Sequence, residues 1–157
     1  MKQILLTQGK FALVDNRDYW LVRQFKWCVA KDGNKWYAVT HTPRDKYGKQ
    51  KTIKMHRLLA GFPPFALDHK NGDGLNNRRG NLRPATNSEN QANRGVPITN
   101  TSGYKGVHWS AKDKQWKAAI RVCGSRYYLG YFTNKIAAFG AYYMAAQLYF
   151  DQFAIAA

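Results

Sequence analysis

Acidic residues are scarce in this sequence, and their scarcity gives the first indication of function. Lysine and arginine number 25 against nine aspartates and glutamates, so the 157 residues carry a formal charge of +16. The only glutamate is Glu89. The excess is spread along the chain, with a net +11 over residues 1–100 and a net +5 over residues 101–157. A folded chain that is cationic throughout favours a polyanionic partner, above all nucleic acid.

Cysteines and long apolar runs are also few. Cys28 and Cys123 stand 95 positions apart, which excludes a CxxC zinc site and a dense disulfide framework, and we expect two buried, reduced thiols. No apolar run approaches the roughly 20 residues that cross a bilayer, and the opening residues lack the features of a signal peptide. We therefore expect a cytoplasmic protein with no membrane partner.

Apolar residues make up 45% of the chain and aromatic residues 15%, enough to bury a core in one ordinary domain or two small ones. Residues 1–65 read as short strands separated by turns. The expected strands are Lys2–Leu6, Phe11–Val14, Lys26–Ala30, Lys35–Thr42 and Lys51–Lys54, and the expected short helices are Asp18–Phe25 and Met55–Ala60.

Residues 66–94 break this pattern, because they are poor in apolar residues and crowded with asparagine. Thr86 followed by Glu89 predicts a helix start with a capping box. That motif gives the only glutamate a structural role, which we prefer to a catalytic one. Residues 95–103 then read as a linker.

The last third predicts a small sheet packed on one helix. Apolar Trp116, Ala118 and Ile120 alternate with the residues between them, so one face of this strand is apolar and the other basic. Three strands are expected over residues 104–132, and a helix over 134–150 with Asn134 as its cap. We therefore expect an α+β fold, with an N-terminal domain at 1–94, the linker, and a C-terminal domain at 104–153.

The central segment holds four residues whose chemistry suits phosphodiester hydrolysis: Asp68, His69, Asn81 and Asn90. Carboxylate and amide oxygens are ligands that Mg²⁺ or Mn²⁺ prefers, and a divalent cation neutralises charge on a scissile phosphate. Histidine, with an ordinary pKa near 6.5, can accept a proton from water at neutral pH. Taken singly, each residue also suits a turn, a core or a helix surface. Because adjacent strand residues point to opposite sides, Asp68 and His69 would need a distorted strand to converge.

The run DHKNGDGLNNRRGNLR, with Asn90 beyond it, resembles the ββα-metal motif of HNH endonucleases, in particular the phage and intron homing group. The resemblance implies that Asp68 and Asn90 hold one divalent cation, that His69 is the general base and that Asn81 braces the loop, with Asn77 as the alternative brace. The preceding Met55-His56-Arg57 also fits the group, although His56 is left open between a structural and a functional role.

The C-terminal residues Tyr104-Lys105-Gly106-Val107, Trp116-Lys117-Ala118-Ala119-Ile120-Arg121 and Tyr128-Leu129-Gly130 resemble a second family, the DNA-binding domain of plant ethylene-response factors of the APETALA type. That resemblance implies a three-stranded sheet lying in the major groove. The implied contacts, with one added from strand alternation, are Lys105, His108, Lys117, Arg121, Arg126 and Tyr128. His108, Ala119 and Tyr128 depart from the plant pattern, so the plant target sequence does not transfer.

The leading hypothesis is a metal-dependent DNA endonuclease that leaves 5′-phosphate and 3′-hydroxyl ends, the products implied by the HNH resemblance. Double-stranded DNA is the expected partner, and a phage-encoded enzyme would act in the bacterial host cytoplasm. The candidate backbone contacts of the central segment are Arg78, Arg79, Arg83 and Arg94. The main alternative is a non-catalytic DNA-binding regulator. An RNA-binding protein is a third class, less favoured because a sheet face fits a wide major groove.

Overall fold

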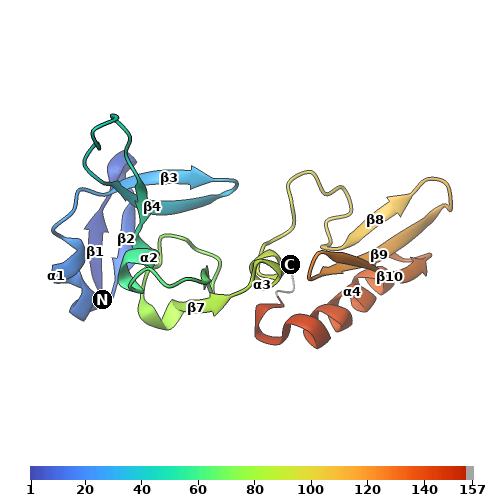
Figure 1. Ribbon diagram of the computed structural model, residues 1–157. Coiled ribbons are helices and arrows are strands. Elements are labelled where there is room, and N and C mark those ends of the chain that lie inside the picture. Colours follow the sequence, from blue (N-terminus) through green and yellow to red (C-terminus); the bar gives the residue numbers. More distant parts are fainter. Residues whose placement is uncertain (155–157) are drawn as a thin grey trace. The chain divides into compact units, whose positions relative to one another are not determined.

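The computed structural model describes residues 1–154, which form two compact units, Met1–Pro84 and the residues from Ala85 onward (Figure 1). Several small sheets and short helices make up a mixed fold, in agreement with the expected α+β class. The units divide inside strand β7, and the helix at Asn87–Ala92 groups with the C-terminal unit. The expected functional division at residues 95–103 remains a prediction.

The first unit is built from three small sheets. Strand β1 (Lys2–Leu5) pairs antiparallel with β2 (Phe11–Val14). Strands β3 (Cys28–Asp32), β4 (Lys35–His41) and β5 (Thr52–Lys54) form an antiparallel sheet in that order. Strand β6 (Ala66–His69) pairs with β7 (Leu82–Ala85). The helical segments are α1 (Tyr19–Val22), α2 (Met55–Leu59) and the 3-10 turns η1 (Thr7–Gly9), η2 (Asn16–Asp18) and η3 (Arg79–Asn81).

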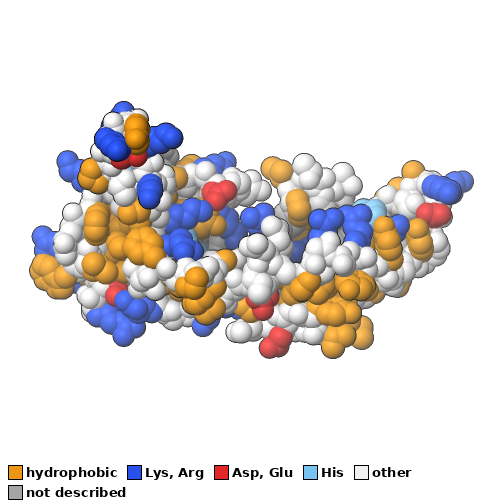
Figure 2. All heavy atoms as spheres, viewed as in Figure 1, with side chains coloured by type: hydrophobic (Ala, Val, Ile, Leu, Met, Phe, Trp, Pro, Cys, Tyr) orange, Lys and Arg blue, Asp and Glu red, His pale blue; other side chains and the backbone are white. Residues whose placement is uncertain are grey.

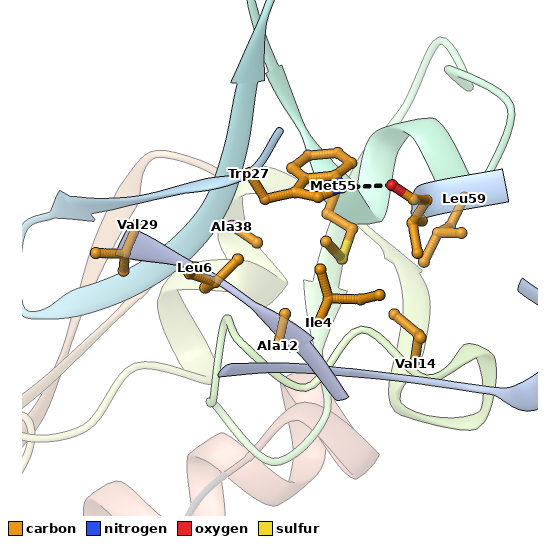
Figure 3. Packing of buried hydrophobic residues seen from close by; sticks show 10 residues of the cluster. Ile4, Leu6, Ala12, Val14, Trp27, Val29, Ala38, Met55 and Leu59 are labelled. Carbon is orange, nitrogen blue, oxygen red and sulfur yellow. Dashed lines mark hydrogen bonds between the residues drawn. The ribbon is translucent and has the colours of Figure 1, made fainter. Parts of the chain in front are cut away.

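The core of this unit joins the first hairpin to α2. Ile4 on β1 and Ala12 and Val14 on β2 are buried. Ala12 and Val14 are two positions apart, as expected for a strand with one buried face. Met55 reaches from α2 toward Ile4 and Trp27, and its side chain is fully buried (Figure 3). The Trp27 indole N–H donates to the Val22 carbonyl at 2.8 Å, so the buried ring is also satisfied as a donor. This core fixes α2 and the strands that carry the candidate site.

The second unit places a three-stranded sheet against one long helix. Its elements are α3 (Asn87–Ala92), β8 (Val107–Ser110), β9 (Gln115–Val122), β10 (Ser125–Phe132), α4 (Lys135–Phe150) and the 3-10 turn η4 (Asp151–Phe153). The sheet order is β10-β9-β8, and all pairings are antiparallel. Ala118 and Ile120 of β9 are buried in clusters with α4 residues.

Gly106, just before β8, is required by this packing. Its φ is +72°, and a Cβ atom there would lie 2.0 Å from the ring of Tyr142 on α4. A side chain at position 106 would therefore meet both backbone strain and a steric clash. The close approach holds the start of β8 against the helix.

Most expected elements are found, with shifted ends. The capping box of Thr86 and Glu89 is confirmed, as is the cap at Asn134, whose side chain accepts from the Ile136 N–H at 2.7 Å. The helix expected at Asp18–Phe25 is shorter, because Val22 already accepts the Trp27 indole N–H and the chain turns into the core.

The prediction of two buried cysteines is wrong. Cys28 is only half-buried, and Cys123 is exposed in the turn between β9 and β10; both thiols are free. The turn consists of Cys123 and Gly124, with φ of +48° and +86°, which leaves the Cys123 side chain outside the sheet. None of the helices described within residues 1–154 has the length and apolar character to cross a membrane.

Candidate active site

The loop between β6 and β7 explains the crowd of asparagines. Asn71 and Asp73 each accept a backbone N–H two residues later, from Asp73 at 3.0 Å and from Leu75 at 2.9 Å. Such local side-chain bonds are the reason that Asn and Asp dominate turns. The loop is also fastened to β2, because the Leu13 carbonyl accepts the Asn77 N–H at 2.8 Å. The segment is thus a fixed loop built from its own polar side chains.

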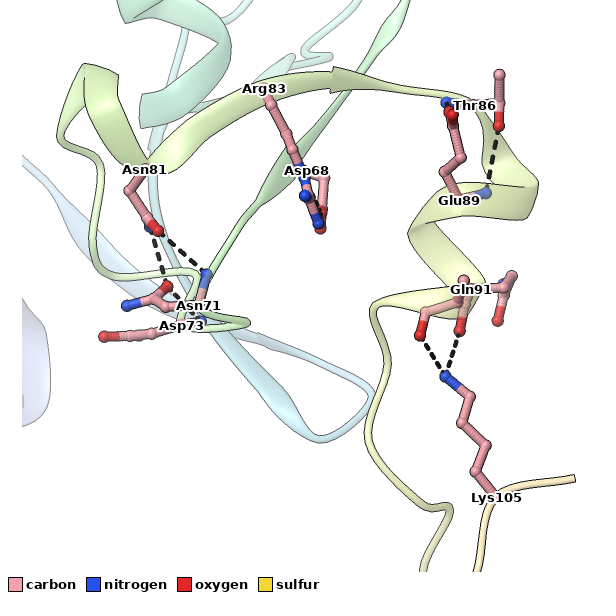
Figure 4. Close-up of polar contacts among 10 residues, drawn as sticks. Asp68, Asn71, Asp73, Asn81, Arg83, Thr86, Glu89, Gln91 and Lys105 are labelled. Carbon is pink, nitrogen blue, oxygen red and sulfur yellow. Dashed lines mark hydrogen bonds and ion pairs between the residues drawn. The ribbon is translucent and has the colours of Figure 1, made fainter. Parts of the chain in front are cut away.

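Asn81 spans this loop. Its Nδ2 donates to Asn71 Oδ1 at 3.0 Å, and its Oδ1 accepts the Asn71 N–H at 3.1 Å (Figure 4). Its Nδ2 also donates to the Asn76 carbonyl at 2.7 Å. The side chain is buried. Its amide therefore joins both sides of the loop through three hydrogen bonds.

Asp68 is paired with a cation inside the protein. Arg83 of β7 donates from Nε and Nη2 to Asp68 Oδ2, at 3.0 and 2.9 Å (Figure 4). Asp68 is 4% exposed and Arg83 is 7% exposed. A buried carboxylate needs such a partner, because an unpaired charge away from water is costly. The guanidinium of Arg83, an expected contact of the DNA backbone, is held by Asp68; its contact with DNA stays a prediction.

His69 follows Asp68 on β6 and contacts a different set of residues. Its ring lies 4.9 Å from the ring of His56, edge to face, and both rings lie 5.9 Å from Tyr37. Its Nε2 is 3.4 Å from Asn77 Oδ1. The pKa of His69 is lowered by burial, while the contact with Asn77 and the charge of Asp68 oppose that shift. The imidazole is therefore neutral at pH 7 and able to accept a proton.

His56 is a second neutral imidazole beside it. Burial is the largest cause that lowers the pKa of His56 to about 3, and the neighbouring His69, Lys54 and Arg57 act in the same direction, since a proton on His56 would meet theirs. Tyr37 completes the group from β4, and the Lys54 ammonium lies 4.6 Å from its ring centroid. Tyr37 is not among the site residues expected from the sequence. The pairing of β4 with β5, which leads into α2, brings Tyr37 to the histidines, and no local motif indicates it.

Asn90 lies on α3, in the second unit, so the structure does not test its pairing with Asp68. The order β6, β7, α3 agrees with the expected ββα order along the chain. On α3, the Glu89 carboxylate accepts the Thr86 N–H at 2.6 Å, and Thr86 Oγ1 accepts the Glu89 N–H at 3.2 Å. The glutamate thus caps the helix that carries Asn90.

The donor chemistry fits a hard divalent cation that keeps most of its water. Asp68 offers a carboxylate and Asn90 an amide oxygen, the oxygen ligands that Mg²⁺ and Mn²⁺ prefer. No cluster of three or more His, Cys, Asp or Glu residues suited to a metal occurs within residues 1–154. The Arg83 cation beside Asp68 lowers the affinity of that carboxylate for a metal.

Comparison with known proteins identifies this segment. Residues 63–92 match the model of a family described as HNH endonuclease. This segment therefore resembles HNH endonucleases. The HNH segment (residues 63–92) contains Asp68, His69, Asn81 and Asn90, and its identity supports a nuclease activity.

A curated relative is Protein 3.8 of Escherichia phage T7, 36% identical over 63 residues. The matched region covers 40% of this chain and 52% of the relative, so the chain spans about half the length of the protein it matches. With the HNH segment, this match supports an HNH-type phage protein. No solved structure matches significantly.

The other arginines of the central segment have varied partners. Arg79 forms a forked ion pair with Asp18, at 2.8–3.1 Å, which raises the pKa of the guanidinium. Arg78 donates from Nε to Asn76 Oδ1 at 3.1 Å. Arg94 follows α3 in the second unit, where its carbonyl accepts from the Lys105 ammonium at 2.5 Å.

The sheet of the second unit brings most of the predicted DNA contacts onto one face. In register, His108 stands opposite Lys117, and Arg126 opposite Arg121, so each pair shares a face. Tyr128 lies on the same face, with the Lys117 ammonium 3.9 Å from its ring centroid. Burial, then the charges of Lys117 and Arg126, lowers the pKa of His108. Like charges placed opposite one another destabilise a sheet, so this arrangement favours an anionic partner.

Lys105 is the exception among these predicted contacts. Its ammonium lies at the C-terminal end of α3, where it donates to the Gln91 carbonyl (Figure 4). It also donates to the carbonyls of Ala92 and Arg94. An ammonium has three donors, and these bonds occupy them. The structure thus places Lys105 as a helix cap, where a cation also complements the helix dipole.

Proposed function

We propose that this chain is a metal-dependent endonuclease that hydrolyses phosphodiester bonds in double-stranded DNA. The observation that carries the proposal is the neutral, buried His69, held beside a fixed loop inside the HNH segment. We place its action on DNA in the cytoplasm of a bacterial host, a proposal that the similarity to a protein of Escherichia phage T7 supports.

In the proposed reaction, His69 is the general base. It takes a proton from a water molecule while the water oxygen attacks phosphorus. The bond from phosphorus to the 3′ oxygen breaks in line, and the departing 3′ oxygen takes up a proton from solvent. The ends left are a 5′-phosphate and a 3′-hydroxyl. An Nε2–H tautomer donates to Asn77 Oδ1 and leaves Nδ1 to accept the proton. Asn81 keeps the loop rigid around this base.

Asp68 and Asn90 would hold one Mg²⁺ or Mn²⁺ ion per active site. When bound, such an ion neutralises negative charge that develops on the leaving oxygen. Arg78 and Arg94 are the central arginines that we assign to the DNA backbone, since Arg79 and Arg83 are paired with carboxylates.

We assign target recognition to the exposed face of the β8–β9–β10 sheet, as a module of the ethylene-response-factor type. A three-stranded sheet can lie in a major groove and present side chains to base edges. The residues assigned to this contact are His108, Lys117, Arg121, Arg126 and Tyr128. The module would direct the nuclease centre to its site.

The ion pair of Arg83 with Asp68 favours a second candidate, a non-catalytic regulator that binds specific DNA sequences. A carboxylate already paired with a buried cation binds a second cation less strongly. In that case the HNH segment would keep its fold without its metal.

Nicking of supercoiled plasmid DNA separates the two candidates. We expect the full chain to nick it with Mg²⁺ or Mn²⁺, and His69→Ala to slow the reaction by about 10²–10⁴-fold, the usual contribution of a general base. His41→Ala, at an exposed histidine on β4, is the matched control and should cut normally. DNA binding without nicking, across metals and sequences, would establish the regulator. Full activity of His69→Ala would exclude His69 as the base.

A further inference from the structure

The outward side of helix α4 is an unusual surface for this protein. Its inward side, with Ala138, Tyr142, Ala146 and Phe150, is buried at intervals of four residues. The outward side carries Ile136, Met144 and Leu148, which are 61%, 74% and 79% exposed. With Gly140 these residues form a row at the same four-residue interval, which we name the outer α4 face. Single exposed apolar residues are ordinary, but a contiguous row marks an interaction surface.

Charge indicates which partner this face suits. Lys135, in the first turn, is the only charged residue of α4, in a chain of net charge +16. Nucleic acid or an acidic protein would find almost no cation here, and an amphipathic membrane helix would carry a strongly charged opposite side. The face is instead where a second cationic copy can approach with least repulsion.

Gly140 supplies a second observation. Glycine in the interior of a helix is destabilising relative to alanine. A Cβ atom at Gly140 would meet nothing within 4 Å, so packing inside the chain does not require the missing side chain. Glycine at this position lets the backbone of another helix come close to α4.

We propose that the outer α4 face binds the same face of a second copy about a twofold axis, with the two helices crossing near Gly140. Such an interface is self-complementary, because each apolar side chain meets its equivalents on the other copy. The helix has 16 residues and is about 24 Å long. One helix from each partner gives an interface at the small end of the range, so the dimer dissociates on dilution.

Sedimentation of the full chain over a range of concentrations tests the proposal without reference to nuclease activity. The average mass should rise from the 18.0 kDa of the monomer toward twice that value. Met144→Lys and Leu148→Lys each oppose like charges across the interface, so each should raise the concentration of half-association by about tenfold or more. Ile98→Lys changes an apolar residue that is 89% exposed but lies outside α4, and should leave association unchanged.

Gly140→Ala separates association from folding, because its two effects have opposite signs. The added methyl group favours the helix, so the melting temperature of the monomer should rise, while association should weaken. A mass of 18.0 kDa at every concentration would overturn the proposal. So would an equal effect of Ile98→Lys and Leu148→Lys, or binding to phosphatidylcholine vesicles by a chain that does not self-associate.

Discussion

At the scale of single residues, the HNH segment is notable for how many polar side chains it buries. Asp68, His69, Asn77, Asn81 and Arg83 are each less than a tenth exposed. A buried polar group is tolerated when it is hydrogen-bonded. Asp68 pairs with Arg83, His69 contacts Asn77, and Asn81 bonds to the loop residues Asn71 and Asn76. Loss of one partner therefore leaves a buried polar group without its hydrogen bond. Substitutions here are expected to affect stability as well as catalysis.

Arg83→Ala is expected to destabilise the fold strongly, because it leaves the Asp68 carboxylate buried and unpaired. Breaking a buried ion pair from one side costs about 3–5 kcal/mol, measurable by urea unfolding. Asp32→Asn, which breaks the more exposed ion pair with Lys54, is the control and should cost less than about 1 kcal/mol. Equal losses in the two variants would mean that burial of the Asp68 pair is unimportant.

Stability should also fall with acid, through His56. Its pKa is about 3 in the folded protein and near 6.5 when unfolded, so only the unfolded chain binds the proton between these values. The free energy of unfolding therefore decreases as pH falls from 6.5 toward 3, by about 1.4 kcal/mol per pH unit for this group. The burial of His69 acts in the same direction.

Urea unfolding at pH 7, 6, 5 and 4 measures this dependence. His56→Leu removes one titrating group, so its stability should change less steeply with pH than that of the wild type, by about 1.4 kcal/mol per pH unit. Parallel curves for the two proteins would contradict the assigned burial of His56.

At the scale of elements, the features predicted correctly from the sequence are those with a local signal. The capping box at Thr86 and the cap at Asn134 depend on residues two or three positions apart, and both are present. Elements that depend on tertiary contacts differ more from expectation. The helix after Asp18 ends early because a buried tryptophan bonds to its last turn. Local patterns do not predict such an end.

In the candidate site, too, local features were predictable and tertiary contacts were not. The spacing of Asp68, His69 and Asn81 indicated the HNH segment correctly. The partner of Asp68 lies 15 positions away, and the partner of Arg79 lies 61 positions away. From the sequence alone, both arginines are expected to contact DNA. No residue pattern near either one indicates a carboxylate partner, which only the folded chain brings within reach.

Substitutions in the capping box test whether Glu89 is structural. Thr86→Ala should destabilise the protein by about 1 kcal/mol, the usual cost of losing an N-cap side chain. Glu89→Gln should keep most of the stability, since glutamine also closes a capping box, and it should keep full nicking activity. Thermal unfolding and the plasmid assay measure the two effects. Loss of nicking in a stable Glu89→Gln variant would give the only glutamate a catalytic role.

At the scale of the whole molecule, the basic surplus is shared by the two units rather than confined to a tail. Figure 2 shows lysine and arginine side chains over both, with few acidic ones. In the HNH segment, Arg79 and Arg83 form ion pairs with aspartates. In the C-terminal sheet, by contrast, Arg121 lies directly opposite Arg126. The sheet should therefore contribute more to the electrostatic binding of DNA than its share of the net charge indicates.

The dependence of duplex DNA binding on salt tests this. Each phosphate contact contributes a slope of about −0.9 to the logarithm of affinity against the logarithm of salt concentration. Arg121→Ala and Arg126→Ala should each reduce the slope by about one. Lys135→Ala, on α4 rather than on the sheet, is the control and should leave it unchanged. Equal slopes in all variants would show that the sheet face does not contact DNA phosphates.

The exposed Cys123 has a practical consequence for any measurement of assembly. Its thiol stands outside the sheet in a two-residue turn, where a second chain can reach it. In air, two such thiols form a covalent link that does not involve α4. Asparagine tolerates a positive φ, so Cys123→Asn should preserve the turn and abolish this link. Any association that persists in that variant is non-covalent.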